Sequence, residues 1–201
     1  LGVGSRPEHE VISTLIHEVA HLMHRRALGP ALPPWLDEGL SDELANLYVA
    51  ADGTLSARGW SGKRVEEYDR VTYEGAPASL RVSVRTVHSG QSPKLPQLLS
   101  YDWRQFVVSS RSRLHYDLSA FFLRFLLDEP RRAAAFRTFL RETAQGEPIS
   151  PEGLRQRLDR PWPEVQRDFE DWLVVKAGQT AFGTAPMPAT STPDSASGSA
   201  A

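Results

Sequence analysis

Two histidines and one glutamate stand at a spacing that could bind and use a metal ion. The segment His17-Glu18-Val19-Ala20-His21 has the pattern H-E-x-x-H. Residues four positions apart lie on one face of an α-helix, so His17 and His21 could share one cation. Glu18 lies about 100° further around the helix. From there it could reach a water molecule on that cation, but it could not easily complete the ligand set with the same two histidines.

A third ligand must come from elsewhere in the chain, because a catalytic zinc site uses three protein ligands and one open position. Glu38 is the best candidate. Sixteen residues separate it from His21, which leaves room for a turn and a second helix that returns to the site. Two alternatives stay open at this point: Glu43 is the first, and His24 is the second.

Asp42 follows Glu38 by four residues and therefore shares a face of the predicted second helix. A carboxylate there could accept the free N–H of a ligating imidazole, which would fix the tautomer of the ring and raise its basicity as a ligand. Trp35 precedes Glu38 in the same segment, and we expect it to pack between the two metal-bearing helices.

Hydrophobic periodicity predicts the helices that must position these residues. Apolar side chains recur at intervals of three and four between residues 8 and 28, and Gly29 with Pro30 ends that helix. A second helix is predicted from Leu36 to Tyr48. From about residue 113 the pattern is helical again, and its aromatic stripes indicate core. Further helix starts are expected at Pro130 and at Ser150-Pro151, and the last helix is expected to end at Gly178.

The region between these helical parts is the least regular. Leu80, Val82 and Val84 alternate with polar residues, which predicts one half-buried strand near residues 79–88. The predicted fold is therefore mainly α, with at most this small β element and a C-terminal helical bundle. Residues 1–178 are expected to form one domain. Residues 179–201 are rich in Ala, Ser, Thr and Pro, and we expect them to be disordered.

Composition excludes several kinds of site and partner. The 201 residues include no cysteine, so any metal must be held by histidine and carboxylate. The formal net charge is −2 and acids alternate with the arginines, so we expect no nucleic-acid partner. No apolar run approaches the roughly 20 residues that cross a bilayer, and we expect no membrane span. We also expect no signal peptide within the given residues.

Two segments together resemble the gluzincin zinc peptidases. These are the H-E-x-x-H segment at 17–21 and Pro-Trp-Leu-Asp-Glu-Gly-Leu at 34–40. The spacing of Glu38 and Asp42 is similar to the second zinc helix of thermolysin-like enzymes, and the closer resemblance is to the peptidase MA-like group. It implies zincin-like catalytic helices, one Zn²⁺ ion, Glu18 as general base and a peptide or protein substrate. The metal ligands that it implies are His17, His21 and Glu38.

A later helix in that group often opens with tyrosine, and here the segment His115-Tyr116 precedes a long apolar stripe. The resemblance makes Tyr116 the expected hydrogen-bond donor to the reaction's oxyanion, and His115 is the alternative. Gluzincins normally carry a β-sheet before the first zinc helix. This chain begins just before that helix, so we expect that most of the sheet region is not included in it.

Other functions stay open on the sequence. The chain has no Gly-x-Met-Glu-Asn segment of the kind that binds a free amino terminus in aminopeptidase relatives, which favours an endopeptidase. Export from the cytoplasm is expected by family analogy alone. The main alternative is an inactive zinc-binding or scaffold protein of the same fold. A helical interaction module without metal and a zinc hydrolase acting on another substrate are further alternatives.

Overall fold

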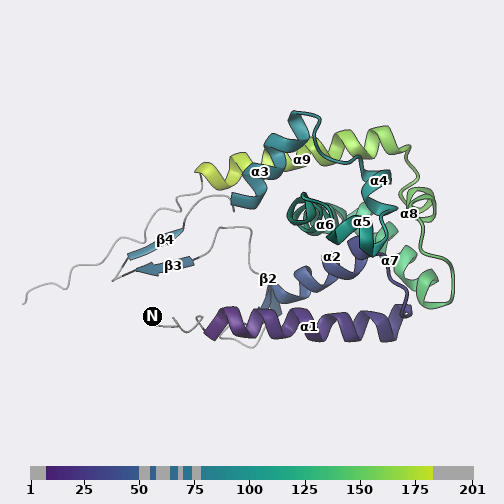
Figure 1. Ribbon diagram of the computed structural model, residues 1–201, viewed down its shortest axis with the longest axis horizontal. Helices are drawn as coiled ribbons and strands as arrows, with labels where there is room; N and C mark the ends of the chain where they lie inside the picture. The colour runs from purple at the N-terminus through teal and green to yellow at the C-terminus, as the bar shows by residue number, and fades with distance from the viewer. Residues whose placement is uncertain (1–7, 50–54, 58–63, 68–69, 74–77, 183–201) are drawn as a thin grey trace, which may run out of the picture.

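The computed structural model describes residues 8–49, 55–57, 64–67, 70–73 and 78–182, and the fold of this part is mainly helical (Figure 1). Its helices are α1 (Glu8–Leu28), α2 (Pro34–Ala45), α3 (Ala78–His88), α4 (Leu95–Leu99), α5 (Trp103–Val107), α6 (Ser112–Leu127), α7 (Pro130–Ala144), α8 (Pro151–Leu158) and α9 (Trp162–Phe182).

Two short antiparallel hairpins lie between α2 and α3 in the sequence. In the first, Leu47 is paired with Ala57, and in the second, Arg64 is paired with Tyr73. Their strands are β1 (Leu47–Val49), β2 (Leu55–Ala57), β3 (Arg64–Glu67) and β4 (Arg70–Tyr73).

Helix α6 is the centre of the core. Figure 1 shows it almost end-on, and it packs against α2, α3, α5, α7 and α9. Its apolar stripe is wide enough to meet several neighbours, and Leu118, Phe122 and Phe125 are at most 2 % exposed. Phe122 contacts Trp35 of α2 on one side and Phe169 of α9 on another. The predicted core stripe is confirmed, and α6 is the support on which α2 rests.

A glycine lets α2 approach α6 closely. A Cβ atom at Gly39 would lie 3.2 Å from the carbonyl oxygen of Ser119, which is tighter than most such contacts. Pro34 opens α2 at its first turn, where its missing N–H costs no hydrogen bond. Together these residues fix the helix that carries Glu38.

Helix α1 presents its polar face to α2. Ala20 and His24 lie on the buried side, whereas most of the apolar residues in the helical pattern face outward. Their exposed fractions range from 44 % to 68 % for Val11, Ile12, Leu15, Val19, Leu22 and Met23. Gly29 ends the helix with a φ of +104°, a conformation that glycine adopts without strain.

The strand predicted near residues 79–88 is wrong, because α3 occupies this segment. The alternation of Leu80, Val82 and Val84 covers too few residues to decide between strand and helix. Leu80, Val84 and Val87 also follow a helical spacing, and they pack against the core while Val82 is 52 % exposed. The helix is stabilised because α3 packs on α9 and α6.

Two predicted helix ends also differ from the structure. Helix α2 ends at Ala45 instead of Tyr48, because Leu47–Val49 pairs as a strand. Helix α9 continues through Gly178 to Phe182. The rest of the predicted tail, 183–201, lies outside the described residues.

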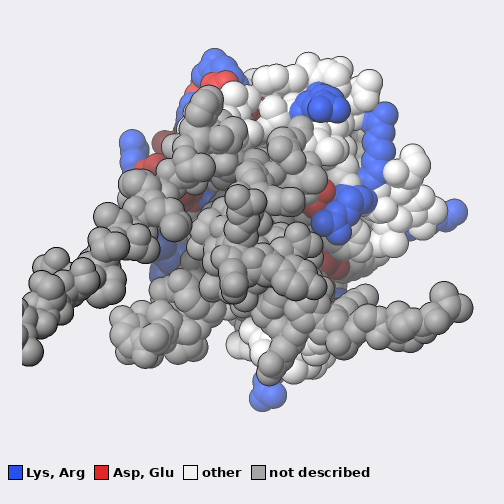
Figure 2. Space-filling model, turned by 90° about the vertical axis from the view of Figure 1, so that its left-hand side faces the viewer, with Lys and Arg blue, Asp and Glu red and all other residues white. Residues whose placement is uncertain are grey.

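None of the described helices combines the length and the hydropathy that a membrane crossing requires. Figure 2 shows basic and acidic side chains together on one face of the molecule.

Candidate metal centre

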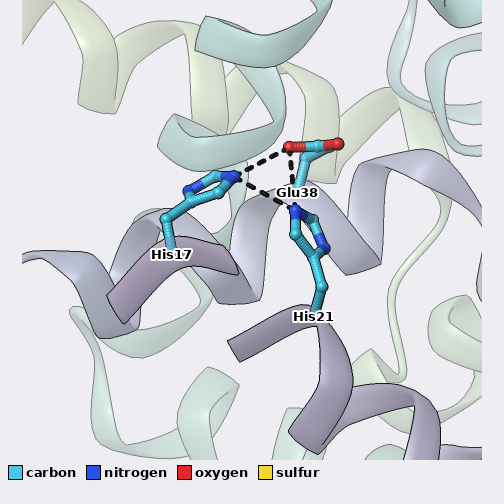
Figure 3. A group of neighbouring side chains, drawn as sticks. All are labelled: His17, His21 and Glu38. Atoms are coloured by element: carbon cyan, nitrogen blue, oxygen red, sulfur yellow. Dashed lines mark hydrogen bonds and ion pairs between the residues drawn. The ribbon is translucent and has the colours of Figure 1, made fainter. Parts of the chain in front are cut away.

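Three possible ligand atoms converge between α1 and α2 (Figure 3). The Nε2 atoms of His17 and His21 are 3.1 Å apart. Oε2 of Glu38 lies 3.3 Å from the first and 3.8 Å from the second. A tetrahedral zinc ion with bonds of about 2.1 Å would place its ligand atoms about 3.4 Å apart. The three side chains therefore match one face of such a tetrahedron.

Carboxylates fix the tautomers of both imidazoles. Nδ1 of His17 lies 3.0 Å from Asp42 Oδ1, and Nδ1 of His21 lies 2.9 Å from Asp37 Oδ1. An ionised carboxylate only accepts hydrogen bonds, so each Nδ1 carries the proton. A neutral ring then has its lone pair on Nε2. Two such lone pairs would face each other at 3.1 Å, which favours a cation or a proton between them.

The electrostatics of the centre favour positive charge. Hydrogen bonds from His17 to Asp42 and to Glu38 raise the pKa of His17 from 6.5 to about 10, against the opposing effect of burial. In the protein without metal, His17 is thus protonated at neutral pH. The same carboxylates would stabilise a divalent cation in that place.

Sequence reasoning missed Asp37, which α2 places in the centre of this network. Its side chain is fully buried, and Oδ2 accepts hydrogen bonds from Arg25 Nη2 at 2.8 Å and Nε at 3.2 Å. Ser41 Oγ donates to the Asp37 carbonyl oxygen and lies 3.1 Å from His21 Nδ1. The only available sequence signal was Arg25 itself, four residues after His21 and so on the same face of α1.

The proposed base and oxyanion donor occupy different surroundings. Glu18 is exposed on α1 and directly follows His17 in the sequence. Tyr116 is half-buried on α6, with its ring 4.9 Å from that of Phe106. Burial and the negative charges of Glu38 and Asp42 raise the pKa of the Tyr116 phenol. Tyr116 therefore stays protonated at neutral pH and can donate a hydrogen bond, and its pKa depends on the charges of the centre.

His115, the alternative oxyanion donor, lies in other surroundings. It is 3 % exposed, and its Nδ1 donates to the carbonyl oxygen of Phe106 at 3.0 Å. It lines a surface hollow together with Tyr101 and Arg111, and none of the three possible metal ligands lines this hollow. The alternative of His115 as oxyanion donor has no support in this geometry.

Neither of the two alternative third ligands belongs to the group of converging ligand atoms. Oε1 of Glu43 accepts a hydrogen bond from Nε of Arg124 on α6 at 2.8 Å. His24 is buried, and burial lowers the pKa of its imidazole. Among the described residues, the group that could hold a metal ion is formed by His17, His21 and Glu38. Trp35 is buried as a packing residue, and its ring lies 6.1 Å from that of Phe122 on α6.

Comparisons with known proteins add no family to this geometry. No protein-family model, no curated protein and no solved structure matches the chain. Any functional conclusion must therefore rest on the residues of the centre and on the chemistry that they can perform.

Proposed function

We propose that this chain is a zinc-dependent peptidase with a zincin-like pair of helices, in which His17, His21 and Glu38 hold one Zn²⁺ ion. The observation that carries the proposal is the convergence of two imidazole nitrogens and one carboxylate oxygen at the separations of a tetrahedral site. Histidine and carboxylate are ligands of catalytic zinc, and this set leaves a fourth position for water or substrate.

The choice of hydrolysis follows from the residue beside the ligands. A bound zinc ion would lower the pKa of a water molecule toward neutrality and polarise a substrate carbonyl group. Glu18 is the general base in this proposal: it takes the proton of the attacking water and then gives it to the departing amine. Its exposed position on α1 is open to both water and substrate.

The remaining roles belong to α2 and α6. Asp42 and Asp37 hold His17 and His21 with the proton on Nδ1, which presents each Nε2 to the metal. Tyr116 is the proposed donor to the oxyanion that forms on the attacked carbonyl group. The proposed substrate is a peptide bond within a chain. The reason is that the sequence has no Gly-x-Met-Glu-Asn segment of the kind that binds a free amino terminus.

Two variants test the hydrolytic roles against cleavage of a mixed peptide library. Glu18→Gln is expected to keep the zinc and lose nearly all cleavage, because the amide cannot take a proton. Tyr116→Phe is expected to keep the zinc and lose about 100-fold in turnover. Glu147→Gln is the matched control, because Glu147 is exposed and lies outside the metal centre.

Metal analysis of the same samples separates the possible outcomes. A Glu18→Gln variant that cleaves like the parent would refute the role of Glu18. A parent that binds zinc and cleaves no peptide would instead identify an inactive zinc-binding protein or a hydrolase of another substrate. A chelator should abolish any cleavage by the parent, and added zinc should restore it.

A further inference from the structure

The carboxylate of Asp37 on α2 contacts both the proposed ligand His21 and the guanidinium group of Arg25, which are both on α1. Asp37 is 0 % exposed, and its two oxygens serve two different partners. Oδ1 lies 2.9 Å from Nδ1 of His21, whereas Oδ2 accepts from Nη2 and Nε of Arg25 at 2.8 Å and 3.2 Å. A buried carboxylate is stable only when it is paired. Arg25 therefore provides the positive charge that pairs with the buried carboxylate of Asp37.

The two nitrogens of Arg25 also restrict the orientation of Asp37. A guanidinium group that contacts one carboxylate oxygen through Nε and Nη2 holds it from a fixed direction. Arg25 and His21 are four residues apart on α1, so both reach α2 from the same face. With Oδ2 held by Arg25, Oδ1 is directed at the imidazole.

Ser41 strengthens this arrangement because it can act only as an acceptor for His21. Its hydroxyl proton is donated to the carbonyl oxygen of Asp37 at 2.8 Å. Its oxygen, 3.1 Å from Nδ1 of His21, is then a second acceptor at the same ring nitrogen as Asp37 Oδ1. Both neighbours place the proton of His21 on Nδ1 and leave the lone pair on Nε2, the atom nearest to the other two ligands.

We propose that Arg25 is a positioning residue of the metal centre. Through its ion pair with Asp37 it holds His21 in the tautomer and orientation that bind the metal, and it thereby sets the metal affinity. This inference rests on the proposed function, because it takes His21 as a ligand of the catalytic zinc. Its test requires no peptide cleavage.

The first measurement is the zinc affinity of metal-free protein, determined by competition with a chromogenic chelator. Arg25→Ala is expected to weaken zinc binding by about 10- to 100-fold, as is typical when the hydrogen-bond support of a ligand is lost. Arg26→Ala is the matched control, because Arg26 is the next residue of α1, is exposed and takes no part in the centre. If Arg25→Ala and Arg26→Ala bind zinc equally well, the inference is wrong.

The second measurement reports on the tautomer and would not respond to a loss of stability alone. Nitrogen-15 NMR of the metal-free protein should show His21 protonated on Nδ1 in the parent and in Arg26→Ala. Arg25→Ala should increase the population that is protonated on Nε2. A weaker zinc affinity without any change in this population would indicate general destabilisation and would overturn the positioning role.

Arg25→Lys keeps the experiment decisive if Arg25→Ala does not fold. Lysine retains the charge near Asp37 but offers a single nitrogen. The zinc affinity of Arg25→Lys should therefore lie below that of Arg26→Ala. An affinity equal to that of Arg26→Ala would refute the inference. The outcome is also separable from that of the proposed function. A response of zinc affinity to Arg25 in a protein that cleaves no peptide would leave the inference standing and the peptidase proposal refuted.

Discussion

At the scale of single residues, the centre is a set of carboxylates arranged around two imidazoles. Asp42 and Glu38 act on His17, and Asp37 acts on His21. Each carboxylate favours a positive charge on or between the rings. The arrangement therefore favours positive charge, and in the protein without metal the protonated ring of His17 supplies it.

This arrangement predicts how the stability of the metal-free protein depends on pH. The pKa of His17 is about 10 in the folded protein and 6.5 as its ordinary value. Since the folded value is the higher one, the protonated ring stabilises the fold fully below pH 6.5, and this contribution is lost as the pH rises toward 10. Urea unfolding of metal-free protein should show this loss. His17→Gln, which cannot titrate, should lose less stability over the same range, and equal losses would contradict the assignment.

Part of the centre could be predicted from residue types and spacing. The four-residue interval between His17 and His21 is a local helical property, and the need for a third ligand pointed to Glu38. The part played by Asp37 could not be predicted. Its partners His21 and Arg25 lie on another helix, so its role depends on how α2 packs against α1.

At the scale of elements, periodicity indicates a helix but not the neighbour that covers each face. Helix α1 was predicted correctly, yet its apolar face is exposed and its polar face meets α2. The strand predicted over α3 is wrong, because Leu80 and Val84 fit both the strand and the helix period and only packing on α9 and α6 decides between them. Short apolar patterns therefore depend on tertiary context more than long ones do.

Two leucines on the paired helices should differ sharply in their effect on stability. Leu36 of α2 is 0 % exposed, whereas Leu22 of α1 is 68 % exposed. Leu36→Ala should lower the free energy of unfolding by about 2–5 kcal/mol, because it leaves a cavity in the core. Leu22→Gln should change it by less than about 0.5 kcal/mol, because it alters only a surface contact. Urea unfolding curves would measure both, and a large loss in Leu22→Gln would show that another part of the molecule covers this face.

At the scale of the whole molecule, the candidate metal centre depends on contacts between distant parts of the sequence. Helix α6 supports α2 through Phe122 and Trp35 and through the close approach at Gly39. Helix α2 in turn holds Glu38 and Asp37 against α1. The individual helices of this stack could be predicted, but their order in space could not, because it is set by packing between residues far apart in the chain.

The binding of zinc to metal-free protein, followed by isothermal titration calorimetry, tests the central claim most directly. The account predicts one zinc ion per chain in the parent and in the Glu147→Gln control. Glu38→Gln should weaken that binding by more than about 100-fold, because it removes one of three ligands and not only a supporting hydrogen bond. A parent that binds no stoichiometric zinc, or a Glu38→Gln variant that binds it as tightly as the parent, would contradict the account.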